Sequence, residues 1–489
     1  MIIKVFFIFL HISAYFLGTF YYEGNQLVFF FFYASSCFYI CHSCRSSFIF
    51  TEFFLSILLW LGFVFKFTLL NFNLTPLKES KPYLELTPNL LDKTLVIISF
   101  GFCLLIILSF LRERYIFDYK ENKKKLYLNN DKVIKLYFDY EWLFLILFIF
   151  IVALFSFLNI KFNIFQKGVI SNNEVSFIFL SIFKWLTMFG FASISSFIIF
   201  AYLKKRKSFY VSLFIGFIES LITSYGFLSR ASAFFNSASL ILGITKFQQL
   251  TNVYKLKKRK IFTILMIFFL FLTSILYFVQ LKRTELLYDN KIIENSNNNK
   301  YLIDQKFEIK GKYLHEIVQY YSNNNKFIDD VTYLILYRWV GLDSMLAVVS
   351  NKNLSEEIFI NSFFEKFDNT KYSYYERVFL NKEDYITHNK NNYGILIPGF
   401  FSYSFYSGSL LFFLFLISLF YFLGIIIEIV AFKFSFGNYV FAALISQIYV
   451  YRLIHFGYMP QNSWQLILSI LINIMMYFFI CYIVEKLKK

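Results

Sequence analysis

Residues 142–158 read WLFLILFIFIVALFSFL, an uncharged run that is long enough to span a lipid bilayer. Two further runs are almost free of charge: IFTILMIFFLFLTSILYFVQL at 261–281, and SLLFFLFLISLFYFLGIIIEIVA at 409–431, which contains one glutamate. Runs of this length with so little charge are typical of transmembrane helices and exclude an ordinary soluble domain. The chain is therefore expected to be an integral membrane protein.

The same apolar pattern recurs along the whole chain. It predicts an all-α, polytopic protein of about 12 transmembrane helices, which forms a single multi-pass domain over residues 1–489. The expected spans are 2–22, 27–43, 47–70, 93–111, 142–160, 177–202, 208–226, 231–248, 261–281, 409–431, 437–454 and 464–484.

Basic clusters fall in every second connection between these spans. Residues 112–135 hold eight Lys and Arg, 204–207 read KKRK, 255–260 read KLKKRK, and the chain ends in KLKK. The positive-inside rule places these connections, and both termini, in the cytoplasm. The long hydrophilic insert 281–398 is then an extracytoplasmic loop.

The composition agrees with a membrane protein, since 58% of the residues are hydrophobic and only 16% are charged. The 71 Phe and 37 Tyr are residue types favoured by AT-rich codons, so we interpret their excess as genome bias. The net charge of +17 resides outside the insert, which holds 15 basic and 16 acidic residues. It indicates orientation and contact with anionic lipids, and we expect no nucleic-acid partner.

The insert is too long to be a passive connection. Residues 327–350 combine apolar and charged positions at mixed helical spacing, which predicts a helix lying on the membrane surface. Residues 388–408 change from polar to apolar and contain three glycines and one proline. They are expected to form a short half-helix that dips to membrane depth.

No motif for nucleotides, dinucleotides or metalloprotease chemistry is present in the sequence. Cys37, Cys41 and Cys44 surround His42, but cysteines in an apolar helix are more often packing residues than metal ligands. We therefore expect no metal and no cofactor.

Five basic residues are expected near the outward face of the membrane: Arg230, Lys282, Arg283, Arg338 and Arg452. Arginine suits a phosphate or diphosphate, because it is permanently charged and donates two parallel hydrogen bonds. These residues would form an anion clamp if they converge. The alternative is that each extends its charge from a helix end to the membrane interface. Arg230 is the strongest candidate, because Ser229, Ala233 and Ser237 form a small-residue stripe that favours close helix packing.

A reaction at this face would also need a proton acceptor. His388 and His455 are outward histidines near membrane depth, and a histidine can accept a proton at neutral pH. The alternative for His388 is a surface residue of an Asn-rich loop. Asp343 and Glu285 are carboxylate alternatives for the same role.

Together these features resemble bacterial O-antigen or capsular polysaccharide repeat-unit polymerases. The resemblance covers the architecture, with a large outward loop before the last three helices, and five pieces of sequence: GFLSRASAFFNSASLILG, FVQLKRTELL, YRWVGLDSMLAV, THNKNNYGILIPGFFSYSFYSGS and YRLIHFGYMPQNSW. It implies a glycosyltransferase-C-like fold in the bacterial cytoplasmic (inner) membrane. The implied activity is a metal-independent glycosyltransferase that polymerises repeat units linked to undecaprenyl diphosphate.

The resemblance also implies roles for individual residues. Arg230, Arg283 and Arg452 would grip the diphosphates, with Arg338 in support, and His388 occupies a place comparable to the histidine of the related ligases. The implied partners are the undecaprenyl-diphosphate-linked oligosaccharide, membrane lipids and a chain-length regulator protein. A ligase, a lipid-linked oligosaccharide flippase or other transporter, and a membrane scaffold are the alternative functions.

Overall fold

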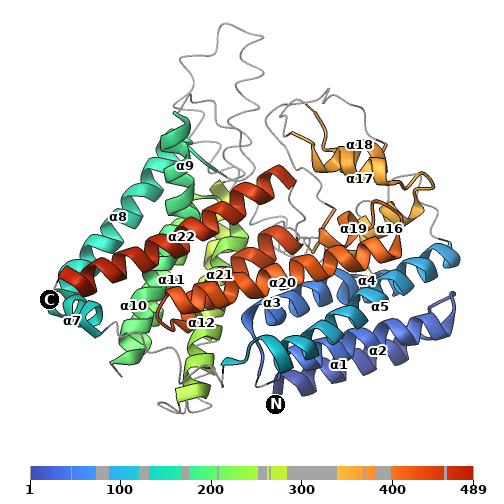
Figure 1. Cartoon of the computed structure of the whole chain (residues 1–489), viewed down its shortest axis with the longest axis horizontal. Helices are drawn as coiled ribbons and strands as arrows, with labels where there is room; N and C mark the ends of the chain where they lie inside the picture. Colours follow the sequence, from blue (N-terminus) through green and yellow to red (C-terminus); the bar gives the residue numbers. More distant parts are fainter. Residues whose placement is uncertain are drawn as a thin grey trace, which may run out of the picture. The chain divides into compact units, whose positions relative to one another are not determined.

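A computed structural model gives the fold of the chain, which is helical in every regular element of its described residues (Figure 1). It describes residues 2–45, 47–72, 87–119, 131–166, 176–205, 209–251, 262–263, 266–282, 339–366, 371–381, 398–455 and 460–487. The chain divides into two compact units. Unit 1 comprises 1–132, 336–386 and 395–489, and unit 2 comprises 133–335 and 387–394.

Unit 1 contains the first and last helices of the chain. They are α1 (Ile2–Gly18), α2 (Gln26–Ser43), α3 (Phe50–Leu59), η1 (Trp60–Phe65), α4 (Lys66–Asn71), α5 (Pro88–Leu111), η2 (Arg112–Ile116), α20 (Leu410–Phe434), α21 (Tyr439–Tyr449), η4 (Val450–His455) and α22 (Pro460–Leu487). The segments η1, η2 and η4 are π-helical turns that continue the preceding α-helices. Helix α2 packs against α5, α5 against α20, and α20 against α21, so the two ends of the sequence form one bundle.

The helices of unit 1 begin where the sequence provides capping groups. The Thr87 side chain accepts a hydrogen bond from the Leu90 N–H, and Pro88 occupies the first turn of α5. The Ser409 side chain caps α20 in the same way by accepting from the Phe412 N–H. These caps satisfy N–H groups that have no partner inside their own helix.

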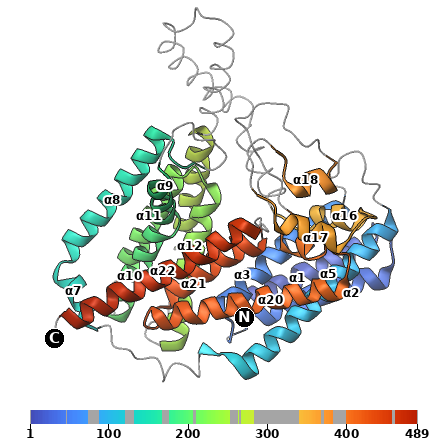
Figure 2. The ribbon, with the colours of Figure 1, turned by 45° about the horizontal axis from the view of Figure 1, so that its top comes forward.

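Three short helices of the insert and one that directly follows it also belong to unit 1: α16 (Leu342–Ser350), α17 (Glu356–Phe363), α18 (Tyr374–Phe379) and, after the insert, α19 (Phe400–Ser404). They gather at one end of α5 and α20 (Figures 1 and 2). Helix α16 is buried from Leu342 to Val349, so the described part of 327–350 does not lie on the surface of unit 1. That prediction was wrong for this part, because residues that looked amphipathic are covered by the bundle on every side. Helix α19 is buried too, and packs against α16 and η4.

Unit 2 is a bundle of the middle helices. They are α7 (Asp131–Asp139), α8 (Glu141–Phe162), α9 (Phe177–Trp185), η3 (Leu186–Gly190), α10 (Phe191–Lys204), α11 (Phe209–Gly226), α12 (Arg230–Thr251) and a helix over Met266–Lys282. Helix α11 is the centre of this unit, because it packs against α8, α10 and α12 (Figure 2). Gly216 allows the close approach, since a Cβ there would lie 2.6 Å from a Leu240 methyl carbon of α12.

Each of the twelve ranges expected from the sequence contains a helix. Within the described residues, seven helices are long and apolar enough to cross a membrane, and four shorter helices are also apolar. This confirms an all-helical, membrane-embedded protein. The number of crossings, the single domain over 1–489 and the extracytoplasmic loop remain predictions.

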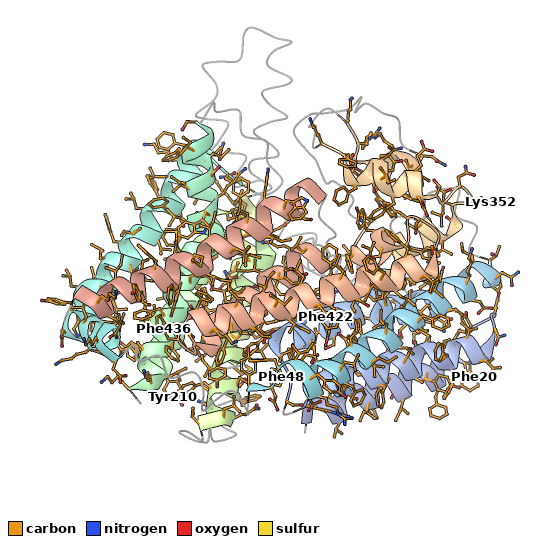
Figure 3. The ribbon with its side chains drawn as sticks, in the orientation of Figure 1. Phe20, Phe48, Tyr210, Lys352, Phe422 and Phe436 are labelled. Atoms are coloured by element: carbon orange, nitrogen blue, oxygen red, sulfur yellow. The ribbon has the colours of Figure 1, made fainter. Side chains whose placement is uncertain are left out.

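The outer surfaces of the helices carry large apolar side chains. Phe20, which is labelled in Figure 3, is 84% exposed. Leu27 is 77% exposed and Leu411 80%. Contact of this apolar surface with lipid is favourable. Its exposure to water would cost free energy in proportion to the exposed apolar area. The exposed apolar surface therefore agrees with the composition.

Candidate functional site

Arg452 is a buried arginine on the π-helical segment η4. Its side chain is only 7% exposed, and η4 packs against α3 and α19. Within the described part of the chain, its guanidinium has no hydrogen-bond acceptor and no carboxylate partner. A buried charge without a partner is unfavourable, so this side chain is suited to receive an anion.

Arg112 shows the opposite arrangement. Its Nε and Nη2 donate to the two Glu52 carboxylate oxygens at 3.0 and 2.5 Å, and its Nη1 donates to the Phe117 carbonyl at 3.1 Å. The Tyr421 hydroxyl donates to the same Glu52 carboxylate. Arg112 is 1% exposed, so the first residue of the basic cluster 112–135 is buried inside unit 1. This bidentate pair joins the start of α3, the end of α5 and α20.

A second carboxylate in the same region belongs to α20. Glu428 accepts hydrogen bonds from the backbone N–H groups of Phe50 and Thr51, at 2.9 and 2.7 Å, and from the Tyr119 hydroxyl at 2.6 Å. It thereby caps the beginning of α3, where the N-cap residue Ile49 has no side-chain acceptor. A carboxylate at a helix N-terminus is also favoured by the helix dipole.

A second buried ion pair, Lys66–Asp343, lies where α16 contacts η1 and α4. Lys66 Nζ donates to Asp343 Oδ2 at 2.7 Å, and both side chains are less than 10% exposed. The two backbones nearly touch beside this pair, because a Cβ on Gly341 would lie 2.6 Å from the Gly62 carbonyl oxygen. The Ser402 hydroxyl of α19 donates to the Ser344 hydroxyl of α16 at 3.0 Å. Asp343 is therefore engaged in holding α16, which argues against it as the proton acceptor.

Three buried lysine and arginine residues stand in the described part of unit 1, and they share a local backbone feature. Arg112 is the first residue of η2, Arg452 lies inside η4, and Lys66 directly follows η1. A π-helical turn adds one residue to the helix and rotates the side chains that follow it, and such turns are frequent at functional sites. In this protein they turn long basic side chains toward the interior of the bundle.

Besides Asp343, the structure locates four of the seven basic and histidine residues proposed from the sequence. Arg452 lies in η4, and His455 is the last residue of that segment; both belong to unit 1. Arg230 begins α12, and Lys282 ends the helix Met266–Lys282; both belong to unit 2. The remaining three lie outside the described residues: Arg283, Arg338 and His388. The carboxylate alternative Glu285 lies outside them as well.

Within unit 2 the two located cations lie at the same end of the bundle. Leu228 and Ala233, on either side of Arg230, form one hydrophobic cluster with Ile275 and Val279 of the helix that ends at Lys282. The small-residue stripe Ser229, Ala233 and Ser237 is buried, as its spacing predicted. The convergence of these cations with Arg452 of unit 1 stays a prediction.

The sequence interpretation did not single out Lys66, Glu52 or Glu428. Each is a charged residue inside an apolar run, and that signal alone marks a residue with a partner or a function. Their partners are distant in the sequence: Lys66 and Asp343 are 277 residues apart, and Glu52 and Arg112 are 60 apart.

The chain matches no known protein family, no curated protein and no solved structure. The geometry of its own buried charges is thus the basis for a functional proposal.

Proposed function

We propose that this protein polymerises lipid-linked oligosaccharide repeat units at the outer face of the bacterial cytoplasmic membrane. In this reaction the bond between the anomeric carbon of the donor glycan and an oxygen of undecaprenyl diphosphate breaks. A new glycosidic bond forms to a hydroxyl oxygen of the acceptor unit, and the hydroxyl proton passes to a base. The leaving group is the lipid diphosphate.

The observation that carries the proposal is the unpartnered guanidinium of Arg452. A diphosphate gains negative charge on its bridging oxygen as the glycosidic bond breaks, and a fixed cation stabilises that charge. Arg452 lies on η4, beside α19, which directly follows the insert and where a membrane-bound substrate could bring its headgroup. The charge of Arg452 lacks a protein partner among the described residues, so a bound diphosphate would offset the desolvation penalty of this buried charge in the free protein.

The other residues have supporting roles in this proposal. Arg230 and Lys282 belong to one end of unit 2 and would bind the second diphosphate, together with Arg283 and Arg338. His455 ends the segment that carries Arg452, so it is a candidate base beside His388.

Substitution of Arg452 tests the proposal directly. We expect Arg452→Ala to remove roughly 2–4 kcal/mol of transition-state stabilisation, which lowers the polymerisation rate about 30- to 1000-fold. Arg452→Lys should recover only part of the rate, because an ammonium group cannot make the bidentate contact. The measurement is the rate and chain length of glycan formation at matched abundance in the membrane. Arg114→Ala is the control, since Arg114 is exposed. A normal rate in Arg452→Ala would reject this site.

Cells that lack the protein distinguish the enzyme from its alternatives. Accumulation of single repeat units on the outer face indicates a polymerase, whereas full-length polymer that is not transferred to its final acceptor indicates a ligase. Repeat units trapped on the inner face indicate a flippase.

One observation favours the flippase or transporter as a second candidate. Glu52–Arg112 and Lys66–Asp343 place buried charges near opposite ends of the helix that runs from Phe50 to Asn71. A transporter is expected to carry charge along both halves of its helices, whereas a polymerase needs charge mainly at one face. Both pairs are already neutralised within the bundle, and we therefore keep the polymerase as the first proposal.

The proposed orientation has its own test. A cysteine placed at Asn323 should react with a membrane-impermeant reagent in intact cells, and one placed at Asn122 should not. The reverse pattern would put the insert in the cytoplasm and exclude an outward polymerase.

A further inference from the structure

Among the residues of unit 2 that the structure describes, one carboxylate is deeply buried: Glu219 of α11, which is 2% exposed. Within the described residues its polar partners are hydroxyls only. Ser195 Oγ and Ser220 Oγ each lie 3.5 Å from Glu219 Oε2, and Thr223 Oγ1 lies 3.3 Å from Oε1. No Lys, Arg or His side chain pairs with it in that part of the chain.

These three distances are too long to satisfy a carboxylate. Hydroxyl groups donate to carboxylates at about 2.5–3.0 Å, so distances of 3.3–3.5 Å correspond to weak hydrogen bonds. The Thr223 hydroxyl already donates to the Glu219 carbonyl at 2.8 Å, which leaves its oxygen lone pairs free toward the carboxylate. The Glu219 side chain is therefore surrounded by oxygens that neither neutralise it nor bond it closely.

The same spacing fits a bound ion. Oxygens that surround a cation at about 2.4 Å, the middle of the Ca²⁺–oxygen range, are separated from one another by about 3.4 Å. Na⁺ has nearly the ionic radius of Ca²⁺, and the separations here are 3.3–3.5 Å. A single carboxylate balances one positive charge, whereas calcium sites usually contain several carboxylates.

We propose that Glu219, Ser195, Ser220 and Thr223 form a Na⁺ site between α10 and α11. The carboxylate would supply the charge, and the three hydroxyl oxygens would complete most of the coordination shell. Because the site is buried in an apolar bundle, a bound ion would stabilise the fold by neutralising the Glu219 carboxylate, which otherwise has no cationic partner among the described residues. The site is independent of the proposed polymerase activity and of the orientation of the chain.

Thermal unfolding of the purified full-length protein in nanodiscs tests the site. Unfolding is followed in NaCl, KCl and choline chloride at equal ionic strength. We expect only NaCl to raise Tm, saturably and by about 2–5 °C when Na⁺ exceeds its Kd about 100-fold. Glu219→Gln should abolish this shift, and Thr223→Ala or Ser195→Ala should raise the half-saturating Na⁺ concentration about tenfold.

Glu428→Gln is the matched control, because Glu428 is an equally buried carboxylate that the protein itself satisfies. It should lower Tm in every salt and keep the Na⁺ shift. Glu365→Gln, in the insert region, should likewise keep the Na⁺ shift, because Glu365 is a carboxylate outside the proposed site. Three results would overturn the proposal: no difference between NaCl and choline chloride, an undiminished Na⁺ shift in Glu219→Gln, or a Tm that responds to pH but not to Na⁺, which indicates a proton site. None of these measurements depends on glycan synthesis, so they leave the proposed function untouched.

Discussion

Arg112 and Arg452 are two buried arginines of unit 1 that differ in their hydrogen-bond partners. Both lie on π-helical segments, η2 and η4, and both are less than 10% exposed. The Arg112 guanidinium donates to a carboxylate and to backbone carbonyls, whereas that of Arg452 has no acceptor among the described residues. The contrast separates a charge that holds the fold from a charge that is available to a ligand.

Physical chemistry gives the two arrangements different consequences. A bidentate arginine–carboxylate pair offsets the desolvation of both groups, and removal of one partner leaves the other buried and unpaired. A buried arginine without an acceptor bears its desolvation penalty already, so its removal relieves the fold. The same amino acid can therefore stabilise one site and destabilise another within a single unit.

The buried carboxylates divide in the same way. Glu428 of unit 1 accepts two backbone N–H groups and a hydroxyl at normal distances. Glu219 of unit 2 has only hydroxyls at 3.3–3.5 Å. In both comparisons one group, Arg112 or Glu428, makes close hydrogen bonds that tie helices together. The other, Arg452 or Glu219, lacks a counter-charge among the described residues.

The largest expected effect is on the stability of the Arg112 site. We expect Arg112→Ala to lower the free energy of unfolding by about 3–5 kcal/mol, because Glu52 is then left as a buried, unpaired charge. Arg452→Ala should change it by less than about 1 kcal/mol or increase it. Equilibrium unfolding in mixed micelles measures both variants. The double variant Glu52→Gln/Arg112→Met should recover part of the loss, and equal destabilisation by the two Ala variants would break the comparison.

A somewhat smaller effect is expected at the Lys66–Asp343 pair, which has one hydrogen bond instead of two. Lys66→Ala should lower the stability by about 3 kcal/mol and release α16 from η1 and α4. Hydrogen exchange of the α16 amides, Leu342–Ser350, should then accelerate more than exchange in α2. The paired variant Lys66→Met/Asp343→Leu should restore protection, whereas unchanged exchange in Lys66→Ala would show that this pair does not hold α16.

The sequence predicted the fold better than the site. Long uncharged runs predict helices because a backbone in lipid must satisfy its own hydrogen bonds, and each of the twelve expected ranges contains a helix. The candidate site depends on which charged side chains contact one another. Packing between segments that are distant in the sequence decides those contacts. The sequence placed Arg112 in a cytoplasmic loop because it begins a basic cluster. In the structure its side chain pairs with Glu52 inside the bundle.

The insert shows the same limit. Asp343 and its polar neighbours suggested a surface helix, because a single sequence gives no sign that Lys66 neutralises Asp343. The burial of α16 depends on that pair and on the close approach of Gly62 and Gly341. Arg452 was predicted as a binding residue from its position alone, but its lack of a protein acceptor could be recognised only in three dimensions.

Gly62 gives a prediction of intermediate size. Gly62→Ala would place a methyl group against the Val340 carbonyl, a backbone atom that cannot turn aside. We expect a loss of about 1–3 kcal/mol, together with faster exchange in α16. Gly190→Ala is the matched control, because Gly190 also lies in a π-helical segment and its Cβ would meet only side-chain atoms at 3.1 Å or more. Equal effects of the two variants would mean that the contact between Gly62 and residues 340–341 is not essential.

The smallest expected effect concerns Glu365, a half-buried carboxylate outside the membrane-spanning helices. It accepts a hydrogen bond from the Tyr374 N–H at 2.6 Å and lies 3.6 Å from Arg377. Burial nevertheless raises the pKa of the Glu365 carboxyl above its ordinary value, because desolvation outweighs the backbone N–H and the guanidinium. Glu365 is thus intermediate between the satisfied Glu428 and the unsatisfied Glu219.

An acid whose pKa is raised on folding binds its proton more tightly in the folded state. Its contribution to stability is fully present below the ordinary glutamate pKa of about 4.3, and it is lost as the pH rises through the raised value. We therefore expect protection of the α17 and α18 amides, corrected for intrinsic exchange rates, to decrease from pH 4 to pH 7. Glu365→Gln should remove this decrease, whereas Glu357→Gln, at an exposed position of α17, should keep it. Protection that rises with pH would mean that the ion pair with Arg377 outweighs burial, and Glu365 would then belong with the satisfied carboxylates.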